Sequence, residues 1–357
     1  MIGTIILVLI IFIVVFLQFL YSPLLDFFIG NKILIRKKQV LPVSIIIPAY
    51  NEEKYIARKI KNLKELDYPK KKFEIIVVDN GSKDNTVKIA KKLGVKVLTS
   101  ERGKTNALNM GIKSAKYNIV AMTDADTTLS KNVLRSCVEL IHNDVAAVSA
   151  FTKVIPKDLY YFEAKNRYHE EDWQLRHKEG MLDTTCSLDG KFIMFNKQHF
   201  QEFPKNTICD DFVITLELRK KGFRSVVDPD SIVFEECPSS ISEELKQIRR
   251  RVGLGLDTVF TKDVISMLFN HGYFGNLILP ARRFLSLIVP LFGLYITIYL
   301  FIKLNAFIAL AIILLGFILL SISMPYTLLQ LLGASLGWLD LFLGNINKTT
   351  YWQKVKS

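Results

Sequence analysis

At 357 residues the chain could hold two domains of average size. Half of the residues are hydrophobic and the mean hydropathy is +0.25, so part of the chain is expected in a membrane. The net charge of +13 comes from Lys and Arg residues spread through the expected helices, without the aromatic-studded basic stripe of nucleic-acid-binding proteins. We therefore expect a lipid surface as the partner, and no nucleic acid.

The first apolar segment, residues 2–20, is long enough to cross a bilayer as a helix. No basic stretch precedes it and no small-residue cleavage pattern follows it, which favours an uncleaved anchor over a signal peptide. We expect a transmembrane anchor over residues 1–22. The basic residues between Lys32 and Lys38 then predict, by the positive-inside rule, that the rest of the chain lies in the cytoplasm.

Residues 42–238 alternate short apolar strands with helices, which indicates one catalytic domain. Strands are expected at 43–48, 73–79, 95–99, 118–126, 145–150 and 224–234, with an extended segment at 184–196. Helices are expected at 52–66, 84–93, 105–114, 130–142, 158–179 and, after residues 209–212, up to 222. The alternation predicts an α/β fold with a mostly parallel sheet sandwiched by helices and a ligand site beyond the carboxyl ends of the strands.

The last third of the chain is expected to return to the membrane. Basic and interfacial helices are predicted over 239–283, the first of them at 239–251, and the apolar segments 284–302 and 304–324 are expected to span the bilayer. The segment 325–343 contains polar residues and precedes a basic tail, 344–357, so an interfacial helix is favoured there.

Polar residues follow three of the expected strands, at the edge where a ligand would bind. Residues 48–53 (PAYNEE) end the first strand, and residues 79–82 (DNGS) end the second. Asp124 and Asp126 end the fourth, and on an extended backbone their side chains would point the same way, toward one divalent cation and a diphosphate. An isolated Asp-x-Asp is more often a solvated turn, and Asp79 could equally be a turn former before Gly81.

Six motifs in order carry a resemblance to a known family. They are IPAYNEE (47–53), VDNGS (78–82), RGKTNALN (102–109), DAD (124–126), CDDF (209–212) and QIRRR (247–251). With this order and spacing the chain resembles the inverting family 2 glycosyltransferases of GT-A fold. The resemblance is to the membrane-integrated branch that includes cellulose, hyaluronan and dolichyl-phosphate sugar synthases, and it covers roughly residues 42–255 and the flanking apolar segments.

The resemblance implies a role for each matching residue. The implied nucleotide-sugar-binding residues are Pro48, Ala49, Tyr50, Glu52, Asp79, Lys104, Asp124, Ala125 and Asp126. Asp124 and Asp126 would also hold the metal, Mg²⁺ or Mn²⁺, with Asp126 the more direct ligand. Asp211 would be the general base, and Asp210, Gln247, Arg250 and Arg251 would lie by the diphosphate and the acceptor.

The chemistry of such a reaction agrees with these residue types. Inversion at an anomeric carbon needs a carboxylate that takes the proton of the acceptor hydroxyl, and the leaving diphosphate needs cations to neutralise it. Other interpretations stay open. Asp210 and Asp211 could cap the next helix, and Arg249, Arg250 and Arg251 could bind lipid headgroups; we expect Arg250 in the site and Arg249 in solvent or lipid.

Two further features bear on the substrate. Residues 169–172 contain His, Glu and Asp, but with aromatic neighbours along the helix they are interpreted as a polar face of the helix and not as a metal site. In the family that the chain resembles, processive synthases usually have Trp at the position of Arg251. Arg suits a phosphate and Trp suits a sugar ring, so Arg251 favours an acceptor with negative charge.

The sequence therefore predicts a multi-pass enzyme of the cell membrane with a cytoplasmic catalytic domain. We expect it to move a sugar from a UDP- or GDP-sugar to a lipid-linked acceptor, such as a polyprenyl or dolichyl phosphate or a glycan on it. A processive polysaccharide synthase is the near alternative. A nucleotidyltransferase, or a non-catalytic membrane scaffold, is the alternative of another class.

Overall fold

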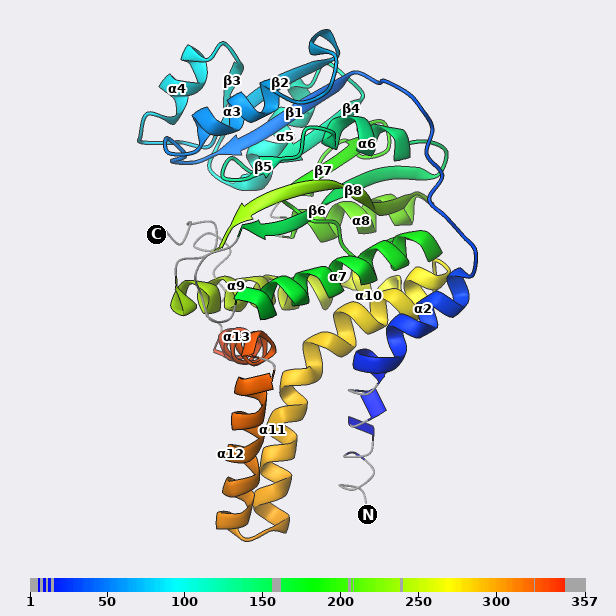
Figure 1. Cartoon of the computed structure of the whole chain (residues 1–357), viewed down its shortest axis with the longest axis vertical. Helices are drawn as coiled ribbons and strands as arrows, with labels where there is room; N and C mark the ends of the chain where they lie inside the picture. Colours follow the sequence, from blue (N-terminus) through cyan, green and yellow to red (C-terminus); the bar gives the residue numbers. More distant parts are fainter. Residues whose placement is uncertain are drawn as a thin grey trace.

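The computed structural model describes residues 6, 9, 10, 12, 13, 16–155, 162–204, 207, 209–237, 240–323 and 325–343. Figure 1 shows three levels: a sheet with its helices at the top, a layer of long helices beneath it, and two projecting helices at the bottom. The strands are β1 (Val43–Ala49), β2 (Phe73–Asp79), β3 (Lys96–Thr99), β4 (Ile119–Thr123), β5 (Thr128–Leu129), β6 (Val145–Ile155), β7 (Phe192–Asn196) and β8 (Arg224–Glu236).

In the described part of the chain these strands form one sheet in the order β3-β2-β1-β4-β7-β6-β8-β5. The half built from β3, β2, β1 and β4 is parallel throughout. In the other half β7 runs antiparallel to both β4 and β6, and β5 runs antiparallel to β8. The α/β fold is confirmed; the first half of the sheet is parallel throughout, and in the second half β6 and β8 also pair in parallel. The second half is mixed because the extended segment after residue 184 enters the sheet in reverse between β4 and β6.

Helices cover both faces of the sheet because its central strands are apolar on both faces; β1, for example, is buried along its whole length. One face packs against α3 and α6 around Ile60 and Val133, and the other packs against α5 and α8 around Leu108 and Ile214. The helices of this upper part are α3 (Ile56–Lys64), η2 (Lys70–Lys72), α4 (Thr86–Lys92), α5 (Lys104–Ser114), α6 (Val133–Leu140) and α8 (Asp210–Lys220).

Beneath the sheet lies a layer of long helices, α7 and α9 above all (Figure 1). α9 continues past residue 251, where the sequence predicted its end, because its apolar side chains Leu256 and Val259 are buried. The remaining helices are η1 (Phe16–Leu20), α2 (Tyr21–Ile29), α7 (Phe162–Leu182), α9 (Ile241–Val259), α10 (Lys262–Ser266), η3 (Phe274–Ile278), η4 (Pro280–Leu285), α11 (Ser286–Lys303), α12 (Ala306–Ser323) and α13 (Pro325–Phe342).

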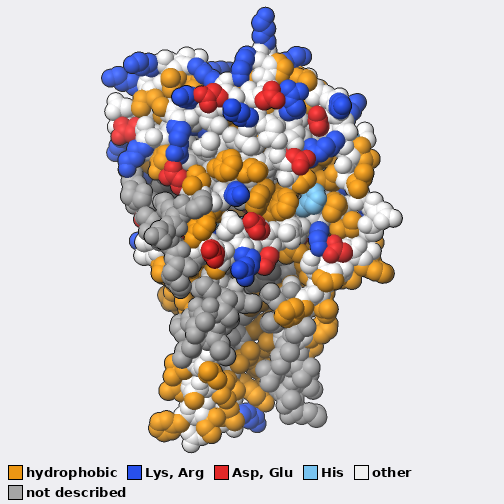
Figure 2. Space-filling model, in the orientation of Figure 1, with side chains coloured by type: hydrophobic (Ala, Val, Ile, Leu, Met, Phe, Trp, Pro, Cys, Tyr) orange, Lys and Arg blue, Asp and Glu red, His pale blue; other side chains and the backbone are white. Residues whose placement is uncertain are grey.

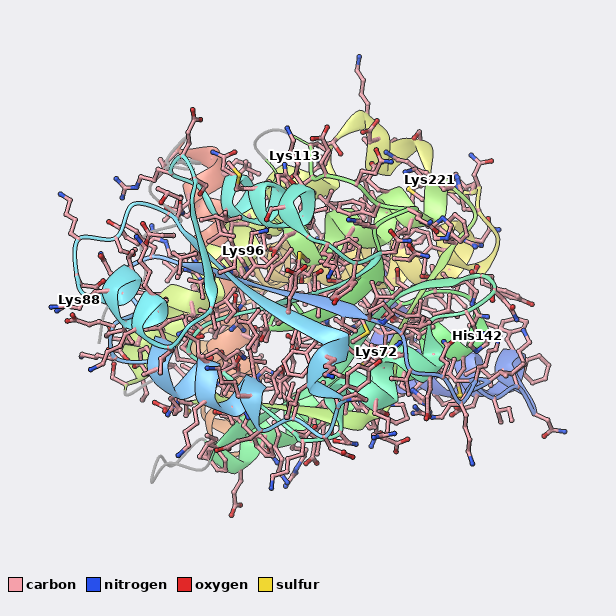
Figure 3. The ribbon with its side chains drawn as sticks, turned by 90° about the horizontal axis from the view of Figure 1, so that it is seen from above. Lys72, Lys88, Lys96, Lys113, His142 and Lys221 are labelled. Carbon is pink, nitrogen blue, oxygen red and sulfur yellow. The ribbon has the colours of Figure 1, made fainter. Side chains whose placement is uncertain are left out.

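The lysine side chains over the sheet lie apart from one another. In the view from above, Lys72, Lys88, Lys96 and Lys113 come from different elements and point outward in different directions (Figure 3). This scatter agrees with the sequence expectation that the positive charge does not form a single basic stripe.

The helices α11 and α12 form an antiparallel pair that projects from the body (Figure 1), and hydrophobic side chains dominate the surface of this pair (Figure 2). Within the described residues, however, no helix combines the length and the apolar character that crossing a membrane requires. The spans expected at 284–302 and 304–324 are therefore corrected. Part of the anchor expected at 1–22, including residues 1–5, and the tail 344–357 lie outside the described residues.

The helix α13 lies against α9, and polar contacts hold it there. Its Asp340 is 4% exposed in the side chain and forms an ion pair with Arg249 of α9. Its Tyr326 donates to Glu244 of α9 at 2.9 Å, and Glu244 is paired with Lys165 of α7. Arg249 is 44% exposed, as expected of a residue in solvent, and it also supplies the cation that the buried Asp340 carboxylate needs.

Truncating Arg249 should therefore loosen α13. We expect Arg249→Met to lower the free energy of unfolding by about 1–2 kcal/mol, a range already reduced because the arginine is 44% exposed. A urea titration followed by tryptophan fluorescence measures this, since Trp338 lies on α13. Arg135→Met, which breaks an exposed pair with Asp67, is the matched control and should change stability by less than about 1 kcal/mol. Equal losses in the two variants would contradict the prediction.

Candidate active site

One large cavity, of about 1420 Å³, has walls from both the sheet and the helical layer beneath it. Strand ends and the first turns of α5 and α8 form one side, and α7, α9 and η4 form the other. Most residues that the sequence singled out line it together: Pro48, Tyr50, Glu52, Lys104, Asp124, Ala125, Asp126, Asp210, Asp211, Gln247, Arg250 and Arg251. The wall as described does not include Ala49 or Asp79.

The loops after β1 and β2 hold each other in place. The Glu52 amide donates to Thr86 Oγ1 at 2.7 Å, and the Asn80 amide donates to the carbonyl of Ala49 at 2.9 Å. Asp79 is buried, and its carboxylate accepts the amides of Gly81 and Ser82 at 3.2 and 3.3 Å. Asp79 thus forms the turn, one of the two roles considered for it; its contact with a nucleotide stays a prediction.

The Asp124–Asp126 motif lies in a turn and not at the end of a strand, because β4 ends at Thr123. The argument that an extended backbone aims both carboxylates the same way is therefore wrong, although both residues line the cavity. A lysine that the sequence analysis did not single out supports this turn. Lys59 of α3 is fully buried and donates to Thr123 Oγ1 at 2.7 Å and to Thr127 Oγ1 at 3.0 Å. Burial lowers the pKa of Lys59 to about 7.

Lys104, at the start of α5, joins the two acidic segments of the site. Its Nζ lies 3.3 Å from Asp124 Oδ1 and 3.1 Å from Asp210 Oδ2. Burial opposes the charge of this ammonium, but the two carboxylates outweigh it and raise the pKa of Lys104. Burial also raises the pKa of Asp210, against the opposing effect of Lys104. Asp124, directly after β4, and Asp210, at the start of α8, are 86 residues apart in the chain and thus meet at one cation.

Asp211 is held from α7 through a short chain of hydrogen bonds. Ser187 Oγ donates to Asp211 Oδ2 at 3.0 Å. Arg176 of α7 donates to the carbonyls of Ser187 and Leu188 at 3.2 and 2.9 Å. Asp210 and Asp211 form the first turn of α8, and the N-cap position is Cys209, without a side-chain cap. Asp210 therefore pairs with a cation in the cavity and does not cap the helix.

The helix α9 contributes Gln247, Arg250 and Arg251 to the cavity. Arg251 Nη2 lies 3.4 Å from Gln247 Oε1, and nearby acids, first of all Glu235, raise the pKa of Arg251 against the effect of burial. Burial lowers the pKa of Arg250, and the neighbouring Arg251 lowers it further. Two guanidinium groups thus face the same cavity as the acidic residues across from them.

The helix α7 forms a wall of the cavity, which the sequence analysis missed. Its Tyr168, His169, Asp172, Trp173 and Arg176 all line the cavity. The segment 169–172, interpreted as a polar face of the helix, supplies His169 and Asp172 to this wall. Helical periodicity identified the face, but only the packing of α7 beneath the sheet shows what the face meets. Asp172 is paired with Arg176 at 2.7 Å and with Arg282 of η4.

His169 should make the chain less stable in acid. Burial, with the nearby cations Lys191 and Arg251, lowers the pKa of His169 to about 3, whereas the ordinary pKa of a histidine side chain is 6.5. Between these values the unfolded chain binds a proton that the folded chain does not, so stability falls as the pH falls from about 6.5. We expect the free energy of unfolding of the native chain, relative to that of His169→Phe, to decrease as the pH is lowered from 7 to 5. A difference that is constant with pH would contradict this.

The acidic residues at the cavity fit a divalent cation held jointly with a substrate. Among the described residues no group of three or more His, Cys, Asp or Glu side chains could hold a metal by itself. Mg²⁺ and similar ions, however, commonly use one or two carboxylates plus substrate phosphates. Asp124 and Asp126 supply such carboxylates, and Lys104 contacts Asp124 through its Oδ1 atom.

Residues 44–203 match the family described as Glycosyl transferase family 2. The chain is 26% identical over 238 residues to the poly-beta-1,6-N-acetyl-D-glucosamine synthase of Staphylococcus aureus, a match that covers 63% of this chain and 57% of that enzyme. It is 28% identical over 283 residues to a dolichyl N-acetyl-alpha-D-glucosaminyl phosphate 3-beta-D-2,3-diacetamido-2,3-dideoxy-beta-D-glucuronosyltransferase of Methanococcus voltae, which covers 72% of this chain and 84% of that one. Residues 44–203 are thus similar to family 2 glycosyltransferases, and the matched region spans 57% of the length of the staphylococcal relative.

A solved structure has the same fold as this chain. It is the mannosyltransferase PcManGT from Pyrobaculum calidifontis in complex with GDP-Man and Mn²⁺, with a TM-score of 0.75 at 21% sequence identity. The likeness covers 95% of this chain and 99% of that one. The chain therefore has a GT-A-like mixed sheet with flanking helices, as the motifs predicted.

Proposed function

We propose that this chain is a family 2 glycosyltransferase, which transfers a sugar, with inversion, from a nucleotide-diphosphate sugar to a lipid-linked acceptor at the cytoplasmic face of a membrane. The observation that carries the proposal is the contact of Lys104 with both Asp124 and Asp210. It brings the donor-binding motif next to Asp211, the candidate base, inside one cavity.

The donor would bind on the sheet side of the cavity. Tyr50, stacked by Arg102 at 5.4 Å, and Glu52 lie where the base and ribose are expected. Asp124 and Asp126 would hold Mg²⁺ or Mn²⁺, which would neutralise the diphosphate when bound. Lys104 and Arg250 would contribute further positive charge to the leaving group.

Asp211 would accept the proton of the acceptor hydroxyl. The hydroxyl oxygen forms a bond to the anomeric carbon as the bond from that carbon to the diphosphate breaks, and the diphosphate leaves with the electron pair. Ser187 donates to Asp211 Oδ2 at 3.0 Å and the Phe212 amide donates to Asp211 Oδ1 at 2.9 Å, and these two hydrogen bonds fix the orientation of the carboxylate.

A membrane location is proposed from exposed apolar side chains. On the pair α11–α12, Leu294, Ile302 and Phe307 are 59, 72 and 84% exposed. Such a continuous apolar surface is typical of a protein or lipid contact. The printed name of the Methanococcus relative includes a dolichyl phosphate acceptor, which supports a lipid-linked substrate for this chain as well.

A processive polysaccharide synthase is the second candidate, supported by the similarity to the staphylococcal synthase. The matched region spans only 57% of the length of that enzyme, and Arg251 stands where processive synthases usually have Trp. We therefore favour transfer to a lipid-linked acceptor.

A panel of radiolabelled nucleotide sugars, offered to membranes that contain the full chain, tests the proposal. We expect metal-dependent entry of label into chloroform-soluble lipid. Label in insoluble polymer would favour the processive synthase, and no transfer from any donor would overturn the proposed function.

A further inference from the structure

The α7 side of the cavity has no role in the donor site or as the base. At about 1420 Å³ the cavity exceeds the roughly 300–1,000 Å³ of a typical single-ligand pocket, so it has room for a second ligand. His169, Trp173 and Arg176 lie on one face of α7, because residues three, four and seven apart share a face. From His169 to Arg176 this face extends about 10 Å along the helix, at 1.5 Å per residue.

The charges on this side of the cavity are already paired. Asp172 is paired with Arg176 and Arg282. Lys191 lies 3.6 Å from Asp189 and 3.3 Å from Glu235. A phosphate placed here would have to displace these carboxylates from their cations. The wall is therefore better suited to a neutral ligand than to an anionic one.

Two buried polar atoms on this wall have no hydrogen-bond partner among the described residues: Nε2 of His169 and Nε1 of Trp173. Buried polar groups are normally hydrogen-bonded, so a ligand that supplies hydroxyl groups would complete both. The indole packs on Phe151 at 4.8 Å and is stacked on His177 at 5.8 Å, which fixes its plane. A fixed aromatic ring with uncharged polar atoms beside it is the combination that suits a sugar ring.

This wall is connected to the candidate base. Arg176, on the same face of α7, donates to the carbonyl of Ser187, and Ser187 Oγ donates to Asp211. A ring held against His169 and Trp173 would therefore lie in the compartment that adjoins Asp211, as an acceptor sugar must.

We propose that His169 and Trp173 form a subsite for an uncharged sugar ring of the acceptor. The inference rests on the proposed function and adds the class of acceptor: a lipid phosphate that already bears a sugar, and not a bare lipid phosphate. The sugar ring lies on the α7 wall, and the phosphate lies toward Arg250 and Arg251.

Binding of methyl glycosides tests the subsite without any need for transfer. Saturation-transfer NMR would be recorded on the full chain with UDP or GDP and Mg²⁺, which is diamagnetic, with methyl glycosides of glucose, mannose and N-acetylglucosamine as probes. We expect a signal for at least one glycoside, reduced about five- to tenfold in Trp173→Phe and in His169→Phe. Phe keeps an aromatic ring at both positions and removes the ring nitrogens.

Matched controls make the same chemical changes elsewhere. Trp338→Phe on α13 and His199→Phe, whose ring packs on Phe223, change residues that do not line the cavity. Both should keep the native signal. A signal absent from the native chain, or equal in Trp173→Phe, His169→Phe and the controls, would overturn the subsite.

Transfer assays separate this inference from the proposed function. With an isoprenoid phosphate that bears one sugar as acceptor, Trp173→Phe should raise the acceptor KM about five- to tenfold and leave the donor KM within about twofold. A bare isoprenoid phosphate should accept sugar poorly from all variants. Efficient transfer to the bare phosphate would overturn the subsite and keep the proposed function. Glycoside binding that depends on Trp173, without transfer to any lipid, would overturn the proposed function and keep the subsite.

Discussion

Replacing Asp211 with Asn should lower kcat about a thousandfold, the order expected when a positioned general base is lost. Asn keeps the size of the side chain and can still accept the hydrogen bond from Ser187, so the geometry at the start of α8 should survive. What the amide lacks is the ability to take the proton of the acceptor hydroxyl. Initial rates of sugar transfer at saturating donor and acceptor measure the effect.

The substitution Asp211→Asn should leave the affinity for the donor nucleotide sugar unchanged. Binding of UDP- or GDP-sugar with Mn²⁺, measured by calorimetry, should stay within about twofold, because the change removes an interaction with the acceptor proton alone. Glu217→Gln is the matched control, since Glu217 is an acid on the same helix that pairs with Lys220 outside the cavity. Full turnover in Asp211→Asn would mean that another group, or none, takes the proton.

Asp126→Asn should reduce metal-dependent binding of the nucleotide at least about a hundredfold, because even residues that only support a metal ligand cost 10–100-fold when changed. The free Mn²⁺ signal in electron paramagnetic resonance, titrated with protein in the presence of UDP or GDP, measures this affinity. The two nucleotides are tested separately because the selectivity for the base is not fixed by these carboxylates.

The exposed acid Asp67 provides the control for this second prediction. Asp67→Asn makes the same chemical change at a carboxylate that pairs with Arg135 away from the cavity, and should leave Mn²⁺ binding unchanged. If Asp126→Asn binds Mn²⁺ and nucleotide as the native chain does, Asp126 is not a ligand, and Asp124 would have to serve alone.

The strand pattern predicted much of the donor side of the cavity. The apolar runs that become β1 and β4 are short, continuous and followed by polar residues, so both the strands and the segments that meet at their ends could be read from the sequence. The contact of Lys104 with Asp124 and Asp210 needed more, because nothing local indicates which acids converge on a given lysine.

The opposite wall could not be predicted in this way. Helical spacing put His169 and Asp172 on one polar face of α7, but periodicity does not tell whether such a face meets water or another part of the protein. Lys59 was missed for a similar reason: a lysine in an amphipathic helix is normally exposed, and only the turn after β4 gives it buried partners. The ion pair between Arg249 and Asp340 joins residues 91 positions apart.

Lys104 also has a consequence for the order in which substrates arrive. Its single ammonium neutralises Asp124, in the donor motif, and Asp210, the neighbour of the base. A divalent cation that binds beside Asp124 would repel the ammonium of Lys104, which would then interact more strongly with Asp210. Binding on the donor side of the cavity would therefore change the electrostatics beside the base without any backbone movement. We therefore expect sequential kinetics in which the nucleotide sugar binds first and the lipid-linked acceptor binds second.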